Sequence, residues 1–127
     1  MTFTLPEPPS ANRYWRLARG RLILWAEARE YRRAAADAML AQGLAPKLRG
    51  LPFPAGTMVR VSLEWHRSIK SGDLDNRLKQ SLDVLKGVVY ADDAQVVEIH
   101  ATRHEAPRAG KLVVGIWAAK GFRREAA

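Results

Sequence analysis

The most regular stretch of the sequence reads Met58-Val-Arg-Val-Ser-Leu-Glu-Trp-His66, in which apolar and polar residues alternate without interruption. Side chains at every second position of a strand point to the same face of the sheet. One face of this segment would therefore carry Val59, Val61, Leu63 and Trp65. The pattern predicts a strand with one face on a hydrophobic core and the other face in water.

Two segments outside this strand have the spacing of amphipathic helices. The first runs from Ala26 to about Gln42, with Gly43 as its stop. The second covers residues 75–86 and ends at Gly87. Its leucines share one face, and an acidic first residue suits the positive end of the helix dipole. Both helices are expected to place an apolar stripe on the strand's buried face: Tyr31, Ala34, Ala35, Ala38 and Met39 from the first, Leu78, Leu82 and Leu85 from the second.

Three further segments read as strands: residues 3–5, 96–102 and 112–119. Residues 10–20 are expected to form an ordered loop, with a short extra strand at Arg21–Leu24 as an alternative, and residues 45–57 to be mostly irregular. The predicted fold class is α/β (α+β), a small mixed, largely antiparallel sheet of about four strands with two packed helices. Residues 1–127 are expected to form a single domain.

Charge is the informative part of the composition. Twenty-one Lys and Arg against 13 Asp and Glu give a net charge of +8, which favours a polyanionic partner such as nucleic acid. The chain has no cysteine, which excludes disulfides and thiolate zinc sites and favours the cytoplasm. No apolar run approaches the roughly 20 residues of a membrane helix. No motif for a small-molecule cofactor is present.

The basic residues cluster in two places. Seven arginines and only two acids lie between residues 13 and 33, and a second cluster contains Arg67 and Lys70. Arginine contacts phosphate through a planar fork, so both clusters suit the DNA backbone. Tyr14 and Trp15 lie within the first cluster. They could stack on an unpaired base or belong to the core.

The carboxylates with chemical potential lie in residues 71–95. Asp73 and Asp75 are two residues apart in an extended stretch, so both point to the same side. The helix carries the chain away by about 17 Å, and the six steps from Gly87 to Asp93 reach back at most about 20 Å. Asp93 can therefore approach the start of the helix. Three such carboxylates would suit one hard cation, Mg²⁺, which would also relieve their repulsion of DNA.

Lys79 lies four residues after Asp75 and four before Asp83, so the three share a helical face. One interpretation is an exposed ladder of ion pairs, each contributing a few tenths of a kcal/mol. The other makes Lys79 a cation beside the scissile phosphate, where it stabilises the transition state. The spacing alone leaves both open. Three histidines are too scattered to predict a histidine-rich metal centre: His66, His100 and His104.

Together these motifs resemble the RusA-type crossover junction endonucleases. Leu5-Pro-Glu-Pro-Pro-Ser-Ala-Asn-Arg-Tyr14 is similar to that family's N-terminal signature. Gly72-Asp-Leu-Asp-Asn76 with Lys79 and Asp83, followed by Asp92-Asp-Ala-Gln-Val96, resembles its core. The similarity extends from Thr4 to about Glu98. Glu7 departs from the pattern, since an aromatic residue is common there. So does Trp25, where a small hydroxyl residue would cap the first helix.

The resemblance implies a homodimeric α/β resolvase, often encoded by prophages, that cuts four-way DNA junctions with Mg²⁺, for which Mn²⁺ can substitute. Asp73, Asp75 and Asp93 match the family's catalytic, metal-associated aspartates, and Lys79 matches its essential lysine. Asp93 is a better match than Asp92. The residues expected to contact DNA are Asn12, Arg13, Tyr14, Arg16, Arg19, Arg21, Arg67, Lys70 and Asn76.

The sequence thus predicts hydrolysis of a phosphodiester bond by metal-activated water, with paired symmetrical cuts made by a two-fold dimer. One rival is a catalytically silent module that binds branched DNA, although carboxylates facing phosphate would gain such a module nothing. Another is a nuclease that prefers flaps or other branched DNA. Cleavage of matched flap, Y-shaped and four-way substrates would distinguish it.

Overall fold

The computed structural model describes residues 1–9, 15–18, 21–24, 26–70 and 72–121, with the backbone alone for 15–18 and 21–24. Its main sheet has four strands in the order β1-β6-β4-β5. β4 runs antiparallel to β6 and parallel to β5, and β1 pairs antiparallel with β6. The predicted mixed sheet of four strands is confirmed. Its strands are β1 (Thr2–Leu5), β4 (Val59–Arg67), β5 (Val96–Glu105) and β6 (Lys111–Ala118).

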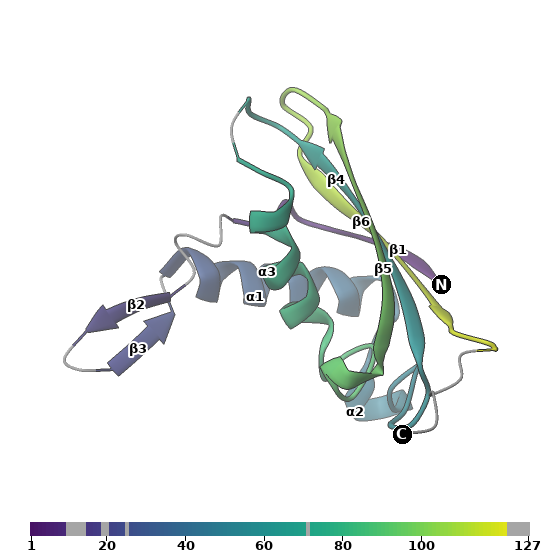
Figure 1. The fold of residues 1–127 in the computed structure, drawn as a ribbon. Coiled ribbons are helices and arrows are strands. Elements are labelled where there is room, and N and C mark those ends of the chain that lie inside the picture. Colours follow the sequence, from purple (N-terminus) through teal and green to yellow (C-terminus); the bar gives the residue numbers. More distant parts are fainter. Residues whose placement is uncertain (10–14, 19–20, 25, 71, 122–127) are drawn as a thin grey trace, which may run out of the picture.

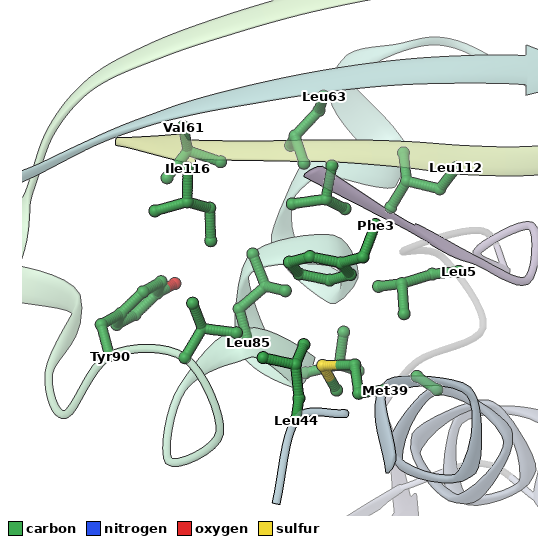
Figure 2. Packing of buried hydrophobic residues seen from close by; sticks show 14 of the residues in the cluster. Phe3, Leu5, Met39, Leu44, Val61, Leu63, Leu85, Tyr90, Leu112 and Ile116 are labelled. Carbon is green, nitrogen blue, oxygen red and sulfur yellow. The ribbon is translucent and has the colours of Figure 1, made fainter. Parts of the chain in front are cut away.

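Strand β4 carries the alternation that its sequence predicts. Its four apolar side chains are at most 1% exposed, and the intervening side chains point to the other face. The two long helices, α1 (Ala26–Ala41) and α3 (Asp75–Leu85), lie on the buried face of the sheet (Figure 1). Phe3 and Leu112 from neighbouring strands meet Met39 of α1 and Leu85 of α3 in the core between the two layers (Figure 2).

The link between β4 and β5 determines the direction of β5. Helix α3 and the short 3₁₀ turn η2 (Asp93–Gln95) return the chain to the start of β4, so that Val96 pairs with Val59. A helical crossover of this kind joins parallel strands. β5 and β6 are consecutive in sequence, yet β4 lies between them in the sheet. The turn after β5 therefore passes the end of β4, where the Ala106 N–H donates to the Arg67 carbonyl oxygen.

A second, two-stranded sheet corrects the expectation of a loop at residues 10–20. β2 (Trp15–Ala18) pairs antiparallel with β3 (Arg21–Leu24), which confirms the alternative strand at the latter position. Four-residue strands are too short to show a clear alternation, and a two-residue link favours antiparallel pairing. In Figure 1 this ribbon lies away from the main sheet, beside the start of α1.

The segment after α1 is mostly irregular, as predicted, except for one helical turn. This turn, α2 (Pro46–Arg49), begins with a proline. Proline is tolerated at the first position of a helix because an N–H there would have no partner within the helix. Within the described ranges, no helix has both the length and the apolar character needed to cross a bilayer.

Candidate active site

An open groove of about 460 Å³ runs between α3 and the beginning of β5. Helix α3 contributes one wall, and the turn before β5 contributes the other. Four charged side chains face the groove above an apolar floor. Its lining consists of Asp75, Leu78, Lys79, Leu82, Asp83, Tyr90, Asp93, Val96 and Ile99.

Helix α3 places Asp75, Lys79 and Asp83 along one wall because residues four apart share a helical face. Asp75 is the first residue of the helix, and its Oδ1 accepts a 3.0 Å hydrogen bond from the Asn76 N–H. Among the described residues, no ion pair within 4.0 Å joins Lys79 to either aspartate. The ladder of ion pairs is therefore not formed here, and all three side chains face the groove.

The turn before β5 separates the roles of two neighbouring aspartates. Asp92 is the N-cap of η2, and its Oδ1 accepts a 3.2 Å hydrogen bond from the Ala94 N–H. Asp93 is exposed and lines the groove. Consecutive residues face different directions at a helix start, so only one of the pair can serve the groove. Asp93, which the resemblance favours over Asp92 as a catalytic residue, is the one that lies there.

Gln95 holds this turn in place, a role that the sequence reasoning missed. The side chain is buried, and its Oε1 accepts hydrogen bonds from the N–H groups of Ala91 and Asp92. Its Nε2 donates to the carbonyl oxygens of Pro54 and Thr57 at 2.9 and 2.8 Å. The available signal was the capping-box spacing of an Asp followed three residues later by a Gln.

Tyr90 forms part of the groove floor, near the carboxylates of Asp93 and Asp83. Its hydroxyl donates a 3.0 Å hydrogen bond to the Leu82 carbonyl oxygen. Burial raises the pKa of Tyr90, and the negative charges of Asp93 and Asp83 raise it further. The phenol therefore remains protonated in the floor of the groove.

Asp73 is exposed on the loop before α3 and does not line the groove. In the part of the chain that the structure describes, no three acidic or histidine side chains are close enough to form a metal cluster. Mg²⁺ prefers oxygen ligands, keeps several waters, and commonly takes only one or two carboxylates plus substrate phosphate. Asp75 and Asp93 in an open groove meet that modest requirement, with Asp73 on the adjoining loop.

A second hollow of about 580 Å³ adjoins the groove and shares Lys79, Asp83 and Asp93 with it. It adds two basic side chains, Arg32 of α1 and Lys86 just after α3. Neither residue was expected at the site from the sequence. Lys86 could have been found, since it follows Lys79 by seven residues, or two helical turns.

The residues predicted to contact DNA differ in how exposed they are, and some lie outside the described residues. The Arg67 side chain is only 13% exposed and is engaged by Glu105 at 2.9 Å and by the Gly72 carbonyl oxygen at 3.1 Å. Lys70 is exposed in a surface hollow that also contains Arg108. Asn76 is half-buried beside the groove. Asn12, Arg13, Tyr14 and Arg19 lie outside the described residues, and only the backbone is described for Arg16 and Arg21.

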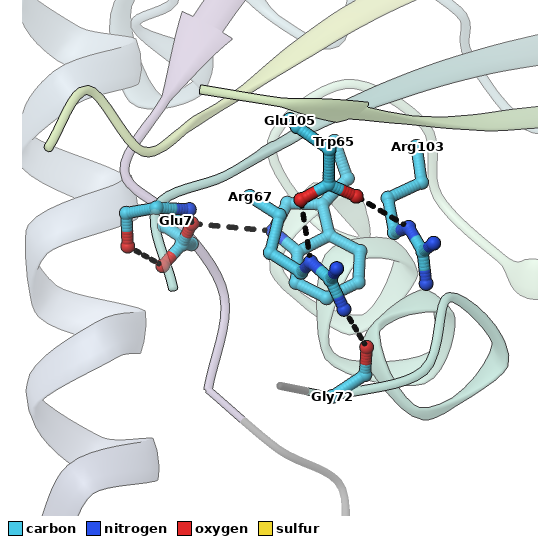
Figure 3. Close-up of polar contacts among 7 residues, drawn as sticks. Glu7, Trp65, Arg67, Gly72, Arg103 and Glu105 are labelled. Carbon is cyan, nitrogen blue, oxygen red and sulfur yellow. Dashed lines mark hydrogen bonds and ion pairs between the residues drawn. The ribbon is translucent and has the colours of Figure 1, made fainter. Parts of the chain in front are cut away.

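The structure gives Glu7 a structural role. Its carboxylate accepts hydrogen bonds from the Ser68 N–H and Oγ at 2.8 and 2.7 Å, and from Trp65 Nε1 at 3.3 Å (Figure 3). The segment after β1 is thereby tied to the end of β4. At this position, where an aromatic residue is common in the family, the chain has a partly buried polar junction.

Two of the three histidines meet across β4 and β5. The rings of His66 and His104 stack with centroids 4.9 Å apart, because these residues pair in the parallel register. Their separation in sequence concealed this contact. They stand on the sheet face opposite the core, and among the described residues they belong to no metal cluster.

Comparison with known proteins agrees with these features. The family model described as Endodeoxyribonuclease RusA matches residues 6–116. The crossover junction endodeoxyribonuclease RusA of Escherichia coli (strain K12) is 37% identical over 121 residues, covering 91% of this chain and 92% of the relative. The protein of that name from Shigella sonnei (strain Ss046) has the same identity and coverage. That of Enterobacteria phage 82 is 38% identical over 119 residues, with 89% and 90% covered. The chain therefore belongs to the RusA family of endodeoxyribonucleases.

Proposed function

We propose that this chain is a Mg²⁺-dependent crossover junction endodeoxyribonuclease whose active site is the groove between α3 and β5. The observation that carries the proposal is the meeting of Asp75, Lys79 and Asp93 in one open groove of a chain with a net charge of +8. They are three of the four residues that the resemblance to the family matches to its catalytic positions, and Asp73 is the fourth. Relatives from bacteria and a phage carry the name of this activity, so we place the enzyme in the bacterial cytoplasm.

Asp75 and Asp93 would hold the cation, with Asp73 reaching it from the loop before α3. A bound Mg²⁺, or Mn²⁺ in its place, supplies a Lewis acid for the phosphoryl oxygen and lowers the pKa of water. Lys79 projects into the same groove and stabilises the negative charge that develops on the phosphate. Tyr90 stays neutral beneath the carboxylates and adds no further negative charge to the site.

The substrate strand would continue from the groove into the adjoining hollow, where Lys86 and Arg32 lie. Phosphate contacts of this kind give affinity and orientation without reading sequence. Lys70 and the arginine-rich residues 13–21 would contact other arms of the junction. Because a four-way junction is two-fold symmetric and must be cut in two strands, we propose a C2 dimer with one groove per subunit.

The test is cleavage of a synthetic four-way junction with and without Mg²⁺, using Asp75→Asn, Asp93→Asn and the matched control Asp92→Asn. Loss of a metal-holding carboxylate should lower the rate by about 10²- to 10³-fold, the range seen for removal of a key electrostatic group. Asn is as good an N-cap as Asp, so the control should keep nearly full activity. Junction affinity should survive in all three variants.

Paired, metal-dependent nicks that vanish in the first two variants alone would support the proposal. Tight binding without cuts in either metal would instead indicate a silent junction-binding module. Faster cleavage of matched flap or Y-shaped DNA than of the four-way junction would shift the assignment to a flap-type nuclease. An equal loss of cleavage activity in Asp92→Asn would contradict the role given to Asp93.

A further inference from the structure

Two arginines hold Gly72, the residue before the first aspartate of the active-site loop. Arg67 Nη1 donates a 3.1 Å hydrogen bond to the Gly72 carbonyl oxygen. Arg77 also packs so closely that a Cβ on Gly72 would lie 2.5 Å from Arg77 Nη2. Gly72 also has φ +93°, a conformation that side chains rarely adopt. Two guanidinium groups thus contact or closely approach the backbone that leads to Asp73 and Asp75.

Arg77 connects three parts of the chain. It lies in the first turn of α3, its guanidinium carbon is 4.9 Å from the centre of a Trp65 ring in β4, and its Nη1 donates a 2.9 Å hydrogen bond to the Pro8 carbonyl oxygen. A planar guanidinium can stack on an aromatic ring and donate hydrogen bonds in its own plane at the same time. An ammonium group cannot reproduce both contacts.

Glu7 provides the opposite charge. Its carboxylate accepts hydrogen bonds from Trp65 Nε1 and from Ser68, and there is no room for a side chain at Gly110, where a Cβ would lie 2.5 Å from Glu7 Oε2. Its negative charge also acts on Arg77, although burial is the larger effect and lowers the pKa of the guanidinium. Removing one of two partly buried opposite charges leaves the other uncompensated.

We propose that Arg77 is a positioning residue that, through Glu7 and Trp65, sets the backbone of residues 72–75 and ties it to Pro8. Pro8 lies in the segment that follows β1. One contact network therefore joins this segment to the loop that carries the carboxylates. The inference rests on the function proposed above and assigns to Arg77 a role exerted through other residues, without contact with metal or DNA.

The first experiment compares Arg77→Met and Arg77→Lys with the control Arg60→Met. Arg60 pairs with Glu98 on the opposite sheet face, so its loss removes the same charge away from the groove. Junction affinity is measured without divalent cation, and single-turnover cleavage is measured against Mg²⁺ concentration. Misplacing the carboxylates should lower the maximal rate of Arg77→Met by about tenfold to a hundredfold. The Mg²⁺ requirement should rise, affinity should match the control, and Arg77→Lys should lie in between.

The second experiment needs no DNA and therefore separates this inference from the proposed function. Amide hydrogen exchange of residues 72–76 in the free protein should become about tenfold faster in Arg77→Met, while strand β4 stays protected. Glu7→Gln keeps the shape of the side chain. It should also accelerate the exchange of these amides, but by a smaller factor. If the wild type cuts no junction while these amides respond, the function is wrong and the positioning role stands.

Two results would overturn the inference. One is unchanged exchange at residues 72–76 together with an unchanged Mg²⁺ dependence in Arg77→Met. The other is weaker junction binding with a normal rate at saturating enzyme, because that pattern belongs to a direct DNA contact.

Discussion

Gln95 shows how much of a site can depend on one uncharged side chain. Its amide satisfies two N–H groups and the carbonyl oxygens of Pro54 and Thr57, and it lies in the same turn as Asp93. The carboxamide suits this position because one end accepts and the other donates. A carboxylate of the same shape would direct a negatively charged oxygen at the carbonyl oxygens.

We therefore expect Gln95→Glu to lower the free energy of unfolding by about 2–4 kcal/mol, as for a buried polar group left without its partners. Gln42→Glu is a matched control, since Gln42 also bridges backbone groups but is exposed to water. It should cost less than about 1 kcal/mol. Urea denaturation of both variants checks the comparison, and equal losses would show that Gln95 is not specially constrained.

At the scale of elements, the link between β4 and α3 is set by a glycine and a guanidinium. Gly72 and Gly56 have nearly the same φ, +93° and +92°, but only Gly72 has a close neighbour in the direction of a Cβ. Gly56→Ala should therefore cost only the backbone strain, about 1–2 kcal/mol. Gly72→Ala should lower the free energy of unfolding by more than this. The new methyl group would displace Arg77 from its hydrogen bond to Pro8 or from its contact with the Trp65 ring.

A double-mutant cycle with Arg77→Met isolates the part of the Gly72→Ala destabilisation that comes from contact with Arg77. The additional cost of Gly72→Ala should disappear once the guanidinium is absent. Thermal or urea unfolding of the four proteins measures the coupling, and additive losses would mean that Arg77 does not restrict the loop.

An ion pair between Arg67 and Glu105 joins the ends of β4 and β5, and its contribution to the stability of the protein depends on pH. Arg67 and Glu105 are partners in the parallel register, and the hydrogen bond from Arg67 holds the pKa of Glu105 below its ordinary value, helped by the charges of Arg67 and Arg103. A lowered pKa means that the folded state favours the ionised carboxylate. The pair's contribution is present above the ordinary pKa of Glu and is lost as pH falls through the lowered value.

Glu105→Gln should therefore unfold at a lower temperature than the wild type at neutral pH. The difference between the two unfolding midpoints should begin to shrink as the pH falls below about 4.5, where the carboxylate of the unfolded chain becomes protonated. It should disappear as the pH falls through the lowered pKa of the folded protein. Calorimetry across this range measures it. A difference that stays constant down to the most acidic pH would assign the effect to packing.

At the scale of the whole molecule, the net charge of +8 should dominate affinity for DNA. Binding that neutralises six to ten phosphates loses about 10³-fold or more in affinity between about 50 and 200 mM salt. We expect a comparably steep dependence for a four-way junction, measured by fluorescence anisotropy without divalent cation. Lys86→Gln should make the slope of log Kd against log salt shallower by about one phosphate contact. An unchanged slope would remove the second hollow from the path of the strand.

Much of the fold and part of the site follow from local sequence. The alternation in residues 58–66, the helical spacing in 26–42 and 75–86, and the order of the aspartates led to the correct fold class and family. Each of these signals lies within one element, where a side chain's face depends only on its position in the repeat. The same logic placed Asp75, Lys79 and Asp83 along one wall.

Only the tertiary structure decided which distant segments meet. β4 separates β5 from β6, Arg67 is engaged by Glu105 and Gly72, and Glu7 and Arg77 meet around Trp65. Glu7 and Trp65 are 58 residues apart. Periodicity in the sequence records which face of an element is buried, but the partner buried against it depends on strand order. That order is settled by the packing of the complete core, which no single segment of the sequence contains.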